Sequence, residues 1–165
     1  MSSVASLLIR PMREADVEPL AEALAWPAQV IQRRWLDQTQ GLRAVLVADV
    51  DGRPVGTVSI NQNQDFPGLL HLFALDVAAA WQRHGIGGEL IGAVEAEARR
   101  QGLSGLYLEV GVENHDATRL YERRGYAQDG DPFLNKWVDY RVDGPPVESQ
   151  ELCHFLFKRF RLERP

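Results

Sequence analysis

The stretch Leu69–Gly102, LLHLFALDVAAAWQRHGIGGELIGAVEAEARRQG, carries the main structural signal of this chain. Its apolar start predicts a strand over Leu69–Val77, and a burst of glycines then precedes a segment with helical periodicity. The first amides of a helix have no intrahelical partner, and they lie at the positive end of the helix dipole. Glycines at Gly85, Gly87 and Gly88 keep side chains away, so that an anion can approach the backbone. This order of strand, glycine turn and helix predicts a phosphate site.

The kind of phosphate ligand can be narrowed by elimination. A nucleoside triphosphate loop needs a Lys and a Ser or Thr after its last glycine, whereas Glu89 and Leu90 follow Gly88. A dinucleotide fingerprint needs a glycine where Leu90 stands, although Glu109 lies near the distance expected of a ribose-binding acid. A dinucleotide-binding oxidoreductase therefore stays open as a minor alternative.

Length and composition bound the class of protein. The 165 residues suit one ordinary domain, so we expect a single domain over 1–165. The net charge of -5 gives no electrostatic case for binding nucleic acid, and no signal or membrane-spanning segment is visible, which predicts a cytoplasmic location. One cysteine, Cys153, excludes a disulfide framework within the chain and is expected in the core. The four histidines lack the spacing of metal ligands, so no metal is expected.

Periodicity and turn signals predict the other elements. Strands are expected over 7–10, 43–50, 54–62, 104–110 and 152–160, and helices over 14–25, 28–38 and 114–124. Asp51-Gly52 is a two-residue hairpin signal. Tyr126-Ala127 is expected to open a short strand, and 130–149 to be a loop that holds Trp137 and Tyr140. The order indicates an α/β protein with one mixed sheet and helices on both faces.

Two sets of residues resemble the GNAT family of N-acetyltransferases. The hexapeptide Gln82-Arg83-His84-Gly85-Ile86-Gly87 is similar to the family's Q-x-x-G-x-G motif for acetyl-coenzyme A, and it follows Leu75-Asp76-Val77. The strand Leu106–Val110, then Asn114, then the run Leu120–Tyr126 resemble a later strand and an Asn-capped helix of the family. The resemblance implies a GNAT-type fold. Its sheet would be mixed but mostly antiparallel, with six to seven strands, of which the fourth and fifth splay around the CoA site.

The resemblance also implies roles at matching positions. Glu109 would be the base that deprotonates an acceptor amine, with His71 a distant second choice, and the Tyr121 hydroxyl would donate a proton to the departing thiolate. The implied reaction is direct transfer of acetyl from acetyl-CoA to a primary amine in a ternary complex, without a metal. The residues implied to bind the cofactor are Leu75, Asp76, Val77, Gln82, Arg83, His84, Gly85, Ile86, Gly87, Gly88 and Asn114.

Partners and acceptor are less closely defined by the sequence. We expect a small-molecule or peptide amine acceptor, no nucleic acid and no membrane, and the aromatic last strand could serve a homodimer. The spacing from Asn114 to Tyr121 resembles bacterial enzymes that acetylate protein N-terminal amines, but the tail departs from them, so their substrate is not transferred. A GNAT-fold sensor that binds an acyl-CoA without turnover is the alternative from another functional class.

Overall fold

The computed structural model describes residues 6–139 and 144–161. The chain divides into two compact units, one of residues up to 61 with 72–96 and one of 62–71 with residues from 97 on. The expectation of a single domain stays a prediction. In the described residues, no helix has the length and apolar character needed to cross a bilayer.

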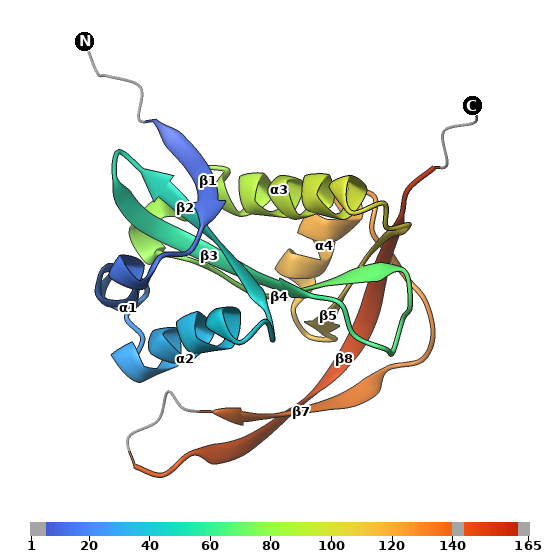
Figure 1. The fold of residues 1–165 in the computed structure, drawn as a ribbon. Coiled ribbons are helices and arrows are strands. Elements are labelled where there is room, and N and C mark those ends of the chain that lie inside the picture. Colours follow the sequence, from blue (N-terminus) through green and yellow to red (C-terminus); the bar gives the residue numbers. More distant parts are fainter. Residues whose placement is uncertain (1–5, 140–143, 162–165) are drawn as a thin grey trace. The chain divides into compact units, whose positions relative to one another are not determined.

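The elements are β1 (Leu7–Pro11), η1 (Glu14–Asp16), α1 (Val17–Leu24), α2 (Ala28–Thr39), β2 (Ala44–Val50), β3 (Arg53–Asn61), β4 (Leu69–Val77), η2 (Ala79–Trp81), α3 (Ile86–Arg100), β5 (Gly105–Gly111), α4 (His115–Arg123), β6 (Ala127–Gln128), β7 (Phe133–Asp139) and β8 (Val147–Arg159) (Figure 1).

The strands form one sheet in the order β1-β2-β3-β4-β5-β8-β6, and β7 pairs with β8 beside this path. The pairs β1–β2, β2–β3, β5–β8, β6–β8 and β7–β8 are antiparallel, whereas β4 and β5 are parallel. The predicted mixed, mostly antiparallel sheet is therefore confirmed. The described residues form eight strands, so the predicted number of six to seven falls one short once the two-residue β6 is counted.

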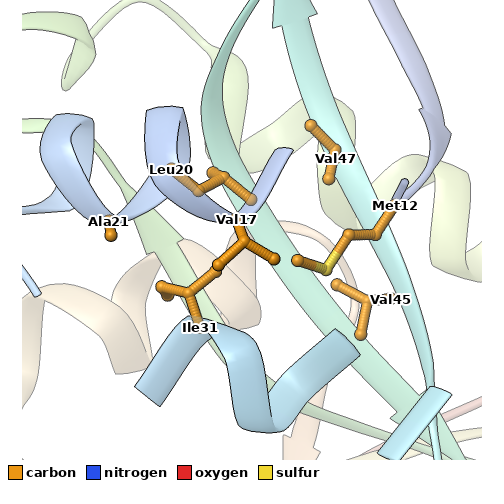
Figure 2. Close-up of a cluster of buried hydrophobic side chains, with 7 residues drawn as sticks. All are labelled: Met12, Val17, Leu20, Ala21, Ile31, Val45 and Val47. Atoms are coloured by element: carbon orange, nitrogen blue, oxygen red, sulfur yellow. The ribbon is translucent and has the colours of Figure 1, made fainter. Parts of the chain in front are cut away.

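The core of the first unit lies between its strands and the helices α1 and α2. Side chains of β2 that point to one face meet the two helices, as Figure 2 shows. The buried members of this cluster are Met12, Val17, Leu20, Ala21, Ile31, Val45 and Val47. Trp26 and Trp35 pack against the cluster and are partly buried. These contacts hold α2 beside the sheet.

Helix α3 covers the opposite face of the same unit. Gly56 on β3 pairs with Ala48 on β2, so both lie on the face opposite Val45 and Val47. A methyl group at position 56 would lie 3.3 Å from the Leu90 side chain of α3 and 3.1 Å from the carbonyl oxygen of Asp76. A glycine is therefore needed for α3 and β4 to approach β3 this closely, and helices on both faces are confirmed here.

Strand β7 was not predicted, and the expectation of a loop over 130–149 was wrong. β7 pairs with the first half of β8, from Phe133 opposite Cys153 to Asp139 opposite Val147 (Figure 1). Most side chains of β7 are exposed, so the stretch lacks the apolar alternation that marks a half-buried strand. Trp137 lies on β7 with 37% of its surface exposed, and Tyr140 lies outside the described residues.

A buried ion-pair network joins the start of the chain to β2. The Arg10 guanidinium donates to both carboxylate oxygens of Asp16 at 2.8 Å and to Asp49 at 3.0 Å. The backbone amide of Arg13 also donates to Asp16, at 2.7 Å. Although burial by itself would raise the pKa of Asp16, these donors outweigh burial and lower the pKa below its ordinary value. The carboxylate of Asp16 therefore contributes stability only while it is charged.

Replacing Asp16 with Asn is expected to lower the free energy of unfolding by about 2 kcal/mol near neutral pH, because charge-assisted bonds to Arg10 are lost. A group with a lowered folded-state pKa stabilises above its unfolded pKa and loses that contribution as pH falls. The difference from the parent should thus shrink below pH 3.8, the ordinary value for Asp. Urea denaturation at both pH values measures it. The control is Asp116→Asn, which removes a carboxylate from an exposed pair with Arg119. If Asp16→Asn lowered the free energy of unfolding equally near neutral pH and below pH 3.8, the explanation would be contradicted.

Candidate active site

The C-terminal half of β4 departs from regular strand geometry. β4 and β5 pair over only three residues, Leu69–His71 with Gly105–Tyr107. Such early termination is expected of strands that diverge, as the GNAT resemblance implies. Ala74 has a φ of 51°, in the left-handed region that non-glycine residues rarely adopt. The three predicted cofactor residues Leu75–Val77 follow this distortion directly. An alanine carries no sequence signal for such a conformation, so the irregularity could not be foreseen.

The predicted glycine turn forms the start of α3. Arg83 and Gly85 have φ values of 64° and 80°, and the helix begins at Ile86. In the described part of the chain, none of the hydrogen bonds has a backbone amide of Arg83–Gly88 as donor. Gln82, Arg83, His84 and Gly85 are exposed. The turn thus presents consecutive backbone N–H groups at a helix N-terminus, which is the arrangement that binds phosphate oxygens.

Two polar side chains of the motif hold the turn in shape. The Gln82 amide donates to the carbonyl oxygen of Val77 at 3.1 Å, which ties the turn back to the end of β4. His84 Nδ1 lies 2.9 Å from the carbonyl oxygen of Gln82, and its ring lies 5.5 Å from that of Trp81. Gln82 and His84 therefore stabilise the turn, in addition to the role in cofactor binding that the resemblance implies.

The side chain of Asp76 faces α2. Its carboxylate accepts a hydrogen bond of 2.9 Å from Arg34, whose side chain is only 8% exposed. Arg34 lies 5.5 Å from the ring of Trp26, and its other terminal nitrogen, Nη1, is buried without a hydrogen-bond partner among the described residues. Sequence reasoning missed Arg34, because a helical arginine is ordinarily solvent-exposed. The carboxylate of Asp76 is thus engaged by Arg34, and a role for its backbone amide in cofactor binding stays a prediction.

Glu109 lies on β5 beside His71 of β4. Its Oε2 is 2.7 Å from His71 Nε2, and the two side chains are 22% and 14% exposed. The register places His71 opposite Tyr107, two residues before Glu109, so all three share one face of the sheet. The Glu109 side chain is therefore partly accessible, and one of its carboxylate oxygens contacts a histidine.

Asn114 and Tyr121 lie on the helix that follows β5. Asn114 is the N-cap of α4, with its side chain accepting from the amide of Ala117 at 3.2 Å. Tyr121 is 6% exposed and packs edge to face with Tyr126 at 5.4 Å. Burial raises the pKa of Tyr121 to about 12, so its hydroxyl stays protonated at neutral pH. The hydrogen bonds of the described residues do not link Asn114 or Tyr121 to Glu109.

Cys153 on β8 is a core residue, as expected. It is 3% exposed, and burial together with the nearby carboxylates of Glu151 and Glu109 raises the pKa of its thiol. A thiol with a raised pKa is a poor nucleophile, because the thiolate is the reactive form. Within 6–139 and 144–161, no group of three His, Cys, Asp or Glu side chains is arranged to hold a metal ion.

Removing the carboxylate of Asp76 should leave the buried Arg34 cation without its partner. We expect Asp76→Ala to lower the free energy of unfolding by about 2–4 kcal/mol, somewhat less than for a fully buried pair because Asp76 is 28% exposed. Urea denaturation measures the change. The double variant Asp76→Leu with Arg34→Met should recover most of the loss, since apolar groups need no counter-charge. A double variant as unstable as Asp76→Ala would show that the charge pair is not the cause.

Comparison with known proteins identifies the family. The sequence pattern of the acetyltransferase (GNAT) family matches residues 4–126. N-acetyltransferase 8 of Mus musculus is 34% identical over 114 residues, which are 67% of this chain and 47% of that protein, so this chain spans about half the length of that relative.

Solved structures with the same fold agree with this match. A ribosomal-protein-alanine N-acetyltransferase of Brucella melitensis superposes with a TM-score of 0.69 at 21% identity, covering 93% of this chain and 99% of its own. A Bacillus anthracis acetyltransferase in complex with acetyl coenzyme A superposes with a TM-score of 0.56 at 17% identity, covering 72% and 63%. With the family pattern spanning both the glycine turn and Glu109, the chain belongs to the GNAT family of acetyltransferases, which use acetyl-CoA.

Proposed function

We propose that this chain is an N-acetyltransferase that moves the acetyl group of acetyl-CoA to a primary amine. The observation that carries the proposal is the run of backbone amides from Arg83 to Gly88 that have no acceptor within the described chain. Coenzyme A carries a diphosphate, whose oxygens are suitable acceptors for such amides at a helix N-terminus. Membership of a family that uses acetyl-CoA supports the same ligand.

The remaining cofactor contacts are proposed from matching positions in the family. Amides of Leu75–Val77 would bind the pantetheine arm and polarise the thioester carbonyl, because a fixed N–H donor stabilises the negative charge that develops on its oxygen. The left-handed Ala74 turns the backbone just before these amides, which supports their use by a ligand rather than by a regular ladder. Asn114 would add a contact to the pantetheine beyond its N-cap bond.

Proton transfer defines the proposed roles of Glu109 and Tyr121. An alkyl amine ordinarily titrates at about 10.4, so at neutral pH it arrives protonated and without a free electron pair. Glu109 accepts one proton, and the nitrogen then forms a bond to the thioester carbon. As the carbon–sulfur bond breaks, the thiolate takes the hydroxyl proton of Tyr121. A second proton then leaves the nitrogen and passes through water to the Tyr121 oxygen, which restores the hydroxyl. The products are an amide, the CoA thiol and one proton, which Glu109 releases to solvent.

The acceptor is proposed only as a class. A carboxylate base suits a cationic amine, whether peptide, polyamine, amino acid or aminoglycoside. The cytoplasmic location, the absence of nucleic-acid and membrane partners and the homodimer stay predictions. The alternative is an acyl-CoA sensor of the same fold, which would bind coenzyme A without turnover, and a nicotinamide-dependent oxidoreductase is a minor alternative that reduced-cofactor titration would expose.

Turnover can be tested by screening the four amine classes for release of free thiol from acetyl-CoA. With any acceptor that reacts, Glu109→Gln should lower kcat by about 10²–10⁴-fold, because the proton has no acceptor. Tyr121→Phe should lower it by about 10-fold or more. Calorimetry should show unchanged affinity for coenzyme A in both variants.

Matched substitutions separate catalysis from damage to the fold. Glu113→Gln changes an exposed acid near the same strand end, and Tyr126→Phe removes a hydroxyl from the ring that packs on Tyr121. Both should keep kcat near that of the parent. Coenzyme A binding with no thiol release from any acceptor class would instead support the sensor, and absence of coenzyme A binding would overturn the proposal.

Direct transfer predicts that Cys153 is dispensable. Its buried thiol with a raised pKa should not attack the thioester, so Cys153→Ala should keep kcat within about threefold of the parent. Intact mass spectrometry of the parent after mixing with acetyl-CoA alone should show no acetyl adduct. An adduct that is lost in Cys153→Ala, together with loss of turnover, would establish a covalent intermediate instead.

A further inference from the structure

His71 and Glu109 form a pair built into the sheet. The imidazole Nε2 lies 2.7 Å from Glu109 Oε2. The pairing of β4 with β5 puts His71 beside Tyr107, and Glu109 follows two residues later on the same face. The contact therefore follows from strand register rather than from a chance meeting of two mobile side chains.

Aromatic neighbours hold the imidazole in one plane. The rings of His71 and Tyr107 stack with centroids 4.6 Å apart and an angle of 8° between their planes. Tyr107 is itself 1% exposed and is fixed by Phe66 at 4.7 Å and by the buried cluster that contains Leu69 and Phe157. Because the stack restricts rotation of the imidazole, Nε2 is directed at the Glu109 carboxylate.

We propose that His71 is a positioning residue for acetyl transfer, which holds Glu109 by one carboxylate oxygen and leaves the other to accept the proton of the acceptor amine. This inference rests on the proposed function. In the neutral imidazole, Nε2–H donates to Oε2, and Oε1 takes the proton. A protonated imidazole would instead stabilise the charged carboxylate and make it a weaker base. The rate should consequently fall when His71 becomes protonated.

Other titratable groups lie near the His71–Glu109 pair, and their effect on the pH profile can be distinguished from that of His71. Tyr107 lies under His71, and burial raises its pKa to about 12. From β8, the Cys153 thiol, whose pKa is raised by burial, and the Glu151 carboxylate face the same side, and Asp65 lies near Tyr107. Tyr107 and Cys153 stay uncharged at neutral pH. Replacement of His71 alone then reports on the imidazole, with both glutamates and Asp65 unchanged.

The test compares His71→Ala, His71→Gln and the parent with a reactive acceptor. We expect His71→Ala to lower kcat by about 10–100-fold with KM for acetyl-CoA unchanged, because the carboxylate loses its fixed orientation. The side-chain amide of His71→Gln can still donate, so it should restore most of the rate. In this variant, the acidic limb of the kcat/KM profile should move to lower pH, because the glutamine side chain has no ring nitrogen that can take up a proton and weaken the base.

A double variant and a histidine control complete the design. In the Glu109→Gln background, His71→Ala should have no further effect, because a positioning residue acts through the group that it holds. His154→Gln, on β8 opposite Val110, is expected to leave rate and pH profile unchanged. Denaturation curves check that each variant is folded. If His71→Ala does not fold, the pH profile of kcat/KM for His71→Gln decides whether His71 has the proposed role.

The outcomes distinguish this inference from the proposed function. If the parent turns over but both His71 variants match it in rate and pH profile, the role of His71 is wrong and acetyl transfer stands. If His71→Ala slows the Glu109→Gln variant as much as the parent, His71 does not act through Glu109. If the parent binds coenzyme A but acetylates no amine, the proposed function fails and the role of His71 fails with it.

Discussion

The parallel pairing of β4 with β5 is the constraint on which the candidate chemistry depends. It aligns His71 with Tyr107 and so brings an imidazole to 2.7 Å from Glu109. A slip of one residue would turn every side chain of one strand to the opposite face, and the pair would be lost. The buried aromatic cluster around Tyr107 disfavours such a slip, because the slip would expose several aromatic side chains to water. Packing that stabilises this unit also orients its acid.

The glycine turn uses a different physical device. The proposed phosphate recognition would depend on N–H groups that have no acceptor within the described residues, at the start of a 15-residue helix. The motif's side chains support this backbone: Gln82 ties the turn to Val77, and His84 contacts the carbonyl of Gln82. Nearby, the buried Arg34 holds the Asp76 carboxylate, so a charge pair anchors the strand end that precedes the turn. The polar residues of the motif therefore build the shape that exposes the amides.

The helices and strands that were predicted correctly are those with strong local signals in the sequence. Strand β4 was predicted with its observed ends, α3 begins at the glycine turn, and Asn114 caps α4 as its side chain indicated. These elements combine apolar periodicity with a capping residue or a glycine, which act within a few residues. Strand β7 was missed because its side chains are mostly exposed and its stability comes from pairing with β8, which is distant in sequence. The Arg34–Asp76 pair spans 42 residues and has no local signal.

The signals that could be interpreted from the sequence alone are local: most of the helices and strands but not β7, the motifs that resemble the GNAT family, and the turn whose glycines expose N–H groups. Which side chains meet depends instead on the packing of elements that are distant in the sequence. The left-handed Ala74, the stacking of His71 on Tyr107 and the burial that raises the pKa of Tyr121 to about 12 depend on neighbours supplied by other elements. The physical reason is that capping and periodicity act over one or two helical turns, whereas burial and electrostatic coupling depend on distance in space.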